Sequence, residues 1–420
     1  MIPDLRRRFQ SIYSPERYSN LLNRLQERCG VPVGFRVAET PVFLHRAMVD
    51  HMAKCGLEMA RELINDAGYM SEARASIPSG FCFAGETNRP HFLTADFALV
   101  RESDGNLAPR LVEIQAFPSV FGFQAALACA YRETYELGND LDSYLGGLDS
   151  PGYWNALCLT VLGRQDPESV VLTEVDPDHQ KTRPDFEVTA RKLGVSIVDI
   201  TKLESEGNRL FYRNRQGRQV PVRRIYNRAI ADEIVSRGIR LPVDFRRPFD
   251  VEWAGHPNWY FLISKFSLPR LSRSRFRHVV PPAVFLDDFL NGQGRISLED
   301  AGVRLPAVGS GATYDGLLLK PLFSFAGKGI QFAPSHEQLT AIPPDRRREY
   351  LLQQRMEFVP TIETPFGMTQ AEVRILYVWP HSGLLTPVIS LVRLGRGKMM
   401  GVDHNRDQQF VGASAAFFPK

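Results

Sequence analysis

The sequence predicts a mixed α/β (α+β) protein whose middle segment forms an open α/β unit. An apolar stretch from Ser169 to Val175 is followed by a helical stretch from Pro184 to Leu193, which Gly194 closes, and by a second apolar stretch from Val195 to Ile200. Strand, helix and strand at this spacing form a βαβ unit with parallel strands. Beyond Lys265, turns separate the apolar stretches, which predicts antiparallel strands. Further strands are expected at 209–212, 220–226, 317–322, 350–358, 372–379 and 388–393.

Helices are expected in the N-terminal part of the chain. Ser14 and Pro15 have the pattern of a helix cap followed by proline at the first helical position, and Gly30 ends the apolar stripe that follows. Thr40-Pro41 predicts the start of a second helix, and a third is expected from Gln124 to Leu137. With 420 residues, two or three domains are expected, and we place them at residues 1–165, 166–260 and 261–420.

Charge and composition exclude several classes of function. The formal net charge of +4 suits an anionic ligand but is too small for a nucleic-acid-binding protein. The five cysteines include no CxxC pair and the nine histidines no HExxH motif, so neither a disulfide framework nor a zinc site is expected. The N-terminus has no signal-peptide pattern and no apolar run reaches bilayer length. We therefore expect a cytoplasmic protein without a nucleic-acid or membrane partner; the sequence does not indicate its oligomeric state.

A hairpin from Phe92 to Phe117 carries the first candidate site. Residues 94–100 and 111–115 alternate with period two, and Asp104-Gly105 between them is typical of a two-residue hairpin turn. Such a turn places Asp96 opposite Glu113 and Thr94 opposite Gln115. Opposed like charges destabilise a sheet, and bound Mg²⁺ would relieve the conflict. On this reading, neutralising Asp96 raises the stability of the metal-free protein. The alternative is the solvent-facing polar side of an ordinary hairpin.

A second candidate site lies where an apolar strand ends at Lys320 and a loop with several small residues, 323–330, follows. Small residues let backbone amides approach phosphates, and lysines supply charge. The loop is not a Walker motif, because Lys328 is followed by Gly329 rather than Ser or Thr. An ordinary turn remains the alternative. A segment that begins at Asp403 resembles an EF-hand loop, but Gln408 and Ser414 replace the required Gly and Glu, so calcium is rejected.

Together these segments resemble the ATP-grasp ligases, in the circularly permuted arrangement of the ligase domain of glutathionylspermidine synthase. In that family, one nucleotide-binding lysine lies ahead of a Val-Pro-rich strand, as Lys265 precedes Val279–Pro282, and another ends a strand before a glycine-rich loop, as Lys320 does. The family's magnesium ligands, Asp and Glu-x-Asn, resemble Asp96 and Glu113-Ile114-Gln115. They come first here, as in permuted members. The resemblance spans about residues 92–412 and includes the segment 223–228.

The resemblance implies a fold in which two antiparallel lobes hold ATP beside an open α/β pre-grasp lobe. It implies an ATP- and Mg²⁺-dependent ligase that joins a carboxylate to an amine through an acyl phosphate, with small-molecule or peptide substrates that the sequence does not identify. The implied nucleotide contacts are Lys265, Lys320, Ser324, Gly327, Lys328, Gly329, Gln353, Gln354, Met356 and Glu372. The implied metal ligands are Asp96, Glu113 and Gln115, and the implied catalytic side chains are Lys328, Arg374 and Arg393.

Two positions depart from the family pattern. Gln115 stands where the family has Asn, which keeps the amide oxygen on a longer side chain. Thr94 stands where the family has an Arg that stabilises the acyl phosphate, and Arg393, Arg396 and Arg228 are the candidates to replace it. The second departure leaves two alternatives open: a nucleotide-binding protein without catalytic activity, and a small-molecule kinase that uses the same lobes.

Overall fold

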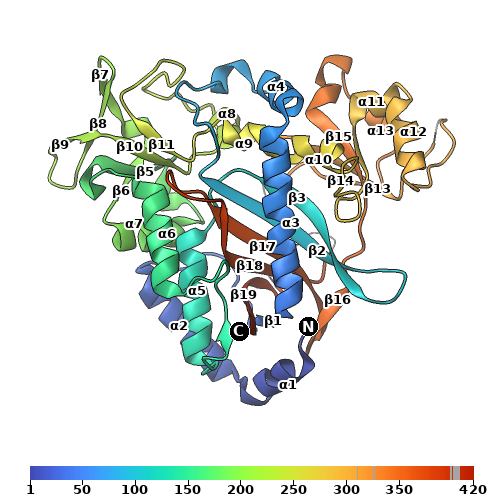
Figure 1. Ribbon diagram of the computed structural model, residues 1–420, viewed down its shortest axis with the longest axis horizontal. Coiled ribbons are helices and arrows are strands. Elements are labelled where there is room, and N and C mark those ends of the chain that lie inside the picture. Colours follow the sequence, from blue (N-terminus) through green and yellow to red (C-terminus); the bar gives the residue numbers. More distant parts are fainter. Residues whose placement is uncertain (310, 325–326, 398–399, 401–406) are drawn as a thin grey trace.

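The protein is described by a computed structural model that covers residues 1–309, 311–324, 327–397, 400 and 407–420. Phe325 and Ala326 of the expected phosphate loop, and residues 403–406 of the rejected calcium loop, lie outside the described residues. A large central sheet runs through the middle of the molecule, and a smaller sheet lies to each side of it (Figure 1). The described residues therefore form a mixed α/β structure with several sheets, as the sequence predicts.

The central sheet joins strands from both ends of the chain. Its order is β1 (Val42–Phe43), β19 (Gly412–Pro419), β18 (Thr386–Gly395), β17 (Gly367–Val378), β2 (Phe92–Arg101) and β3 (Leu107–Gln115). In addition, β16 (Pro360–Thr364) pairs with β17, and β4 (Leu141–Asp142) pairs with β19. All of these pairs are antiparallel except β1 with β19. The sheets thus do not follow the expected division at residue 261, which itself stays a prediction.

Different helices pack against the two faces of the central sheet. Helix α3 (Arg46–Asn65) packs with Ala95 and Ile375 in one core, whereas helix α5 (Phe121–Thr134) packs with Phe92 and Leu376 in another. Because side chains alternate along a strand, even-numbered positions of β2 and β17 face away from α3. Asp96 and Arg374 are such positions, and each lies opposite the other in the register. Polar side chains therefore gather on the face that α3 does not cover.

The β2–β3 hairpin has the predicted pairs, but the turn differs from the prediction. Asp96 lies opposite Glu113 and Thr94 opposite Gln115, as expected. Near the turn, however, Glu102 hydrogen-bonds to Asn106, so the loop has three residues and Gly105 takes the left-handed conformation (φ 84°). A β-bulge at Val112 restores the expected register and also turns Val112 toward the cavity described below, not into the apolar face where it was expected.

The α/β unit is confirmed. Its parallel sheet has the order β11 (Glu252–Ala254), β10 (Arg224–Asn227), β5 (Val170–Glu174) and β6 (Ser196–Asp199), and α7 (Arg183–Leu193) ends at a left-handed Gly194. The strand expected at 220–226 is two strands. Its first part, β9 (Gln219–Val222), pairs with β8 (Arg209–Arg213), which also pairs with β7 (Glu204–Glu206). The second part, β10, joins the parallel sheet.

A third sheet holds the expected antiparallel strands around Lys320. Its order is β12 (Ala283–Phe285), β15 (Tyr350–Gln354), β13 (Leu317–Pro321) and β14 (Gln331–Phe332). Strand β15 ends at Gln354 rather than at Phe358. Helices α11 (Leu286–Leu290), α12 (Gln293–Asp300) and α13 (His336–Thr340) and the short helix η6 (Pro344–Glu349) accompany this sheet (Figure 1).

The N-terminal caps are confirmed for one helix and wrong for another. Helix α2 (Pro15–Cys29) begins with the Ser14 side chain accepting a hydrogen bond from the backbone and ends at a left-handed Gly30. Thr40 instead precedes the short strand β1, because its carbonyl accepts a hydrogen bond from Ser414 of β19.

The remaining α-helices are α1 (Pro3–Ile12), α4 (Ala67–Ala75), α6 (Ser150–Leu162), α8 (Ala231–Ser236), α9 (Trp259–Leu262) and α10 (Leu268–Leu271). In the part of the chain described, no helix is long and apolar enough to cross a bilayer.

The candidate active site

A cavity of about 1130 Å³ lies where the three sheets meet. Ten of the residues singled out from the sequence line it, and they come from β2, β3, β13, β17, β18 and the loops near them: Asp96, Glu113, Gln115, Lys265, Lys320, Gly327, Met356, Glu372, Arg374 and Arg393. Thr94, Arg228 and Arg396 line it as well. The fold thus brings together residues that lie far apart in the sequence.

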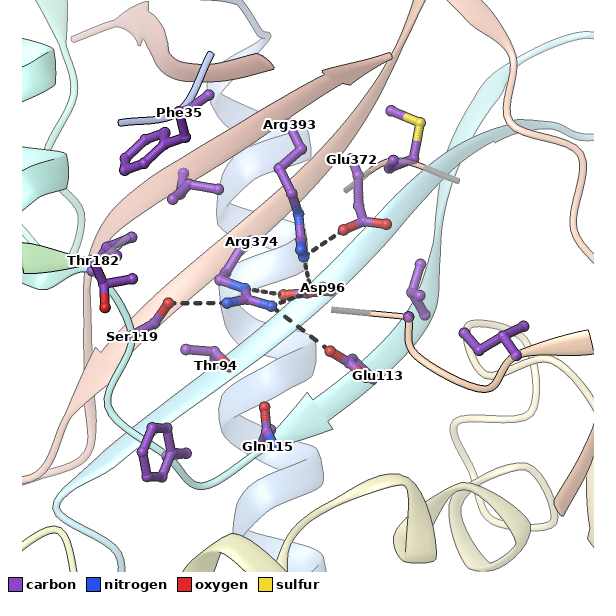
Figure 2. A pocket seen from close by; sticks show the side chains of 18 of the residues that line it. Phe35, Thr94, Asp96, Glu113, Gln115, Ser119, Thr182, Glu372, Arg374 and Arg393 are labelled. Atoms are coloured by element: carbon purple, nitrogen blue, oxygen red, sulfur yellow. Dashed lines mark hydrogen bonds and ion pairs between the residues drawn. The ribbon is translucent and has the colours of Figure 1, made fainter. Parts of the chain in front are cut away.

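Asp96 is the centre of a buried ion-pair cluster (Figure 2). Its carboxylate accepts two hydrogen bonds from Arg374, with Oδ1 and Oδ2 each 2.6 Å from a guanidinium nitrogen. Arg393 Nη2 donates a further hydrogen bond to Asp96 Oδ2. The same Nη2 atom lies 2.5 Å from Glu372 Oε1. Burial alone would raise the pKa of Asp96, but the two arginines outweigh it and the pKa is lowered. Asp96 is therefore an ionised carboxylate whose two oxygens both hold arginines.

Glu113 and Glu372 are the other two carboxylates of the cluster. Glu113 is the less tightly held: its oxygens lie 3.7 Å from Arg374 and 3.5 Å from Lys265, beyond hydrogen-bonding distance. Burial raises the pKa of Glu372 to about 7, the nearby charge of Asp96 adds to the shift, and Arg393 opposes it. Arg374 pairs with both Asp96 and Glu113 (Figure 2), so the chain's own arginine offsets the like-charge conflict expected between the two acids.

Two buried lysines face the same cavity from a different side. Lys265 donates to the backbone carbonyl of Ser324 over 2.6 Å, and Lys320 donates to Gln353 Oε1 over 2.6 Å. Burial lowers the pKa of Lys320 to about 8, the charge of Lys265 adds to the shift, and Glu113 opposes it. Lys320 also lies 3.5 Å from the carbonyl of Val112, the bulged residue of β3. The bulge thus brings β3 close to the lysine of β13.

The remaining residues of the expected nucleotide site lie off the cavity wall. Gln353 is fully buried in β15, and its amide oxygen is already taken by Lys320. The backbone N–H of Gln354, a residue expected to contact the nucleotide, donates a hydrogen bond to the carbonyl of Pro282. Ser324 bonds Lys265, and Lys328 and Gly329 are exposed outside the lining. Their roles toward a nucleotide stay predictions.

The charges of the site fit an anion better than a bare metal ion. Four cations, Lys265, Lys320, Arg374 and Arg393, meet three carboxylates, Asp96, Glu113 and Glu372. Among the described residues, no three His, Cys, Asp or Glu side chains are arranged to hold a metal. A magnesium ion usually uses one or two carboxylates together with the phosphates of its ligand. Glu113 and the amide of Gln115 fit that requirement, whereas Asp96 does not while the arginines hold both of its oxygens.

Several cavity residues were missed in the sequence. Ser119 accepts a hydrogen bond from Arg374 over 2.9 Å, and a group from the α/β unit lines the far part of the cavity: Glu174, His179, Gln180, Lys181, Thr182, Glu233, Ser236 and Arg237. The position of Glu174 in the sequence could have indicated the site, because this residue ends the first strand of the βαβ unit. Ligands of open α/β sheets bind at the carboxyl ends of the strands.

A solved structure shares the architecture of this chain without close sequence similarity. The sequence matches no protein family model and no curated protein. A glutathione synthetase-like effector from Globodera pallida, solved in its apo form, superposes with a TM-score of 0.55 at 12% identity, over 96% of each chain. A candidate gamma-glutamylcysteine synthetase from Methylobacillus flagellatus gives a TM-score of 0.36 at 12% identity, over 90% of this chain and 89% of that one. The first similarity extends over nearly the whole chain and shows a shared architecture.

Proposed function

We propose that the protein is an ATP- and Mg²⁺-dependent ligase with a circularly permuted ATP-grasp fold that joins a carboxylate to an amine. The observation that carries the proposal is the set of four buried or partly buried cations on the wall of one large cavity, where three sheets meet. A polyphosphate is the anion whose charge and size suit four such cations. The glutathione synthetase-like architecture supports a ligase.

The residues of the cluster have distinct roles in this proposal. Lys265 and Lys320 bind the inner phosphates, and Arg374 and Arg393 stabilise the negative charge that develops when the terminal phosphoryl group is transferred to the carboxylate. Arg374, which also donates a hydrogen bond to Ser119, fills the role of the missing arginine in this proposal, in addition to the candidates named from the sequence. Glu113 and Gln115 would hold a magnesium ion, which would supply charge neutralisation for the phosphates.

Calorimetry with ATP and Mg²⁺ tests the nucleotide assignment. Lys265→Ala and Lys320→Ala should each weaken ATP binding by about tenfold or more, because each removes a charge-assisted contact. Lys54→Ala is the matched control, since Lys54 is an exposed lysine of α3 away from the cavity. Unchanged ATP affinity in both cavity variants would remove the assignment.

The reaction itself is tested by ADP release across mixed pools of carboxylates and amines. A ligase releases ADP only when both substrates are present and forms an amide, whereas a kinase leaves a stable phosphorylated product. Both carboxylate oxygens of Asp96 accept hydrogen bonds from arginines, so this expected metal ligand is occupied. This observation favours a second candidate, a nucleotide-binding protein without catalysis. Tight ATP binding without substrate-dependent ADP release selects that candidate.

A further inference from the structure

The far part of the cavity lies at a topological switch point of the parallel sheet. From β5 the chain passes through α7 to β6 on one side, and β10 lies on the other side of β5. The loops that follow β5 and β10 therefore diverge, which leaves a crevice at the carboxyl ends of these strands. The cavity extends into this crevice, where Gln180 and Thr182 line it from the loop after β5 and Arg228 lines it from the loop after β10.

Glu174 is an acidic side chain that lines this crevice. It is the last residue of β5, is only 4% exposed and lines the cavity. Among the described residues its carboxylate has one hydrogen bond, from the backbone N–H of Val175 over 2.8 Å, and no ion pair. Arg228, in the loop after β10, is instead directed to Asp185, 3.6 Å away, and to the carbonyl of Pro118. A buried carboxylate at a cavity wall that forms no ion pair with the described residues is a position for a cationic ligand.

The walls between this crevice and the arginine cluster are largely apolar. Phe35, Phe117, Val120 and Phe123 line the cavity there, and the adjacent Ser119 contacts Arg374. A ligand with an ammonium group at Glu174 therefore has an apolar surface for its carbon chain, and it lies in the same cavity as the proposed phosphate site.

We propose that this crevice binds the amine substrate as its ammonium ion, with Glu174 as the counter-charge. The ligand class is a primary amine with an apolar carbon portion. This inference rests on the proposed function, because that function requires an amine in the same cavity.

Binding of an ammonium ion beside Glu174 should release a proton from its carboxyl group. Burial raises the pKa of Glu174 to about 8; Arg228 opposes the shift, and Glu233 and Asp199 add to it. His179 and Lys181 line the same crevice. Near pH 7 the carboxyl is thus mostly protonated, and an ammonium ion binds the ionised form. Close to one proton is released for each amine bound.

The test is calorimetry with 1-aminopentane and its uncharged counterpart 1-pentanol, in two buffers of different ionisation enthalpy. The amine should bind wild-type protein at least tenfold more tightly than the alcohol and release about one proton. Glu174→Gln keeps the shape of the side chain but should lose both the preference and the proton release. Glu187→Gln, which removes an acid of α7 that pairs with Arg183 outside the cavity lining, should change neither.

Equal binding of amine and alcohol, amine binding that Glu174→Gln leaves unchanged, or amine binding without proton release would each overturn the inference. Should Glu174→Gln fail to fold, the wild-type preference and proton release decide the question by themselves. None of these measurements needs ATP. Amine binding without any ATP-dependent ADP release would therefore refute the ligase and leave the ammonium site standing, whereas ligase activity with no ammonium preference would do the reverse.

Discussion

Replacing Asp96 with asparagine should destabilise the protein in the absence of metal. The hairpin alone predicted the opposite, since two facing carboxylates repel each other. In the folded chain, Asp96 is 1% exposed and its two oxygens receive hydrogen bonds from Arg374 and Arg393. An asparagine side chain at this position would keep one acceptor oxygen, but it would direct an N–H₂ group at a guanidinium and leave two partly buried cations with less counter-charge.

Removing one partner of a buried ion pair costs about 3–5 kcal/mol. Unfolding entropy is roughly 2.1 cal/mol/K per residue. If the 420 residues unfold as one unit, each kcal/mol lowers the melting temperature by about 1 °C, so Tm should fall by about 3–6 °C. A lowered carboxyl pKa stabilises the fold above the unfolded pKa, and this contribution is lost as pH falls through the folded value. The difference between wild type and variant should therefore shrink at pH values below about 4.

Thermal melting near neutral pH with a chelator present is the assay. Glu204→Gln is the control, because it removes a short (2.8 Å) but exposed ion pair with Arg213, and such pairs contribute less than about 1 kcal/mol. A variant at Asp96 that melts at or above the wild-type temperature would refute the balance of charges described for this cluster. The repulsion between Asp96 and Glu113 would then need a bound cation after all.

The other predictions concern the phosphate, metal and packing contacts. The pKa of Lys320, about 8 without ligand, should rise when ATP binds, so calorimetry above that pH should detect proton uptake. Glu113→Gln should weaken ATP binding in Mg²⁺ but not in EDTA, because in the proposal Glu113 contacts the nucleotide through the metal alone. The pKa of Glu372 is raised to about 7, so the folded state binds more protons than the unfolded state at mildly acid pH. The free energy of unfolding should therefore fall from about pH 4.5 to 7. Glu372→Gln should reduce this pH dependence in urea melts. Gly56→Ala should cost about 1–3 kcal/mol in the same melts, because the added Cβ would overlap the Tyr377 hydroxyl beneath α3.

Features of the fold that depend on neighbouring residues could be predicted from the sequence. The caps of α2 at Ser14 and Gly30 and the end of α7 at Gly194 follow from local backbone chemistry. The helix start expected at Thr40 was wrong because β19, which lies far along the chain, pairs with the residues that follow Thr40, and helix α3 begins only at Arg46. The pairing of β17 with β2 likewise has no local signal. Strand partners depend on long-range packing, which alternation alone does not encode.

The candidate site shows the same division. The pair Asp96 and Glu113 was predicted from the hairpin, although the three-residue loop and the bulge at Val112 offset each other to produce it. The sequence could not show that Arg374 would lie between the two acids, since that contact depends on the order of strands in the sheet. Glu174 was missed because the last residue of an apolar strand looks like any strand end until the switch point beside it is known.

The pairing of β17 with β2 has a consequence for the time at which the sheet can form. Asp96 meets Arg374 across a separation of 278 residues. At a synthesis rate of roughly 5–20 residues per second, the hairpin leaves the ribosome about 15–55 seconds before its arginine does. During this interval Asp96 and Glu113 repel each other with no cation between them, and an isolated hairpin is at best marginally stable in water. We therefore expect the nascent hairpin to remain open until β17 arrives, so that the charges which define the site also delay the pairing of β2 with β3.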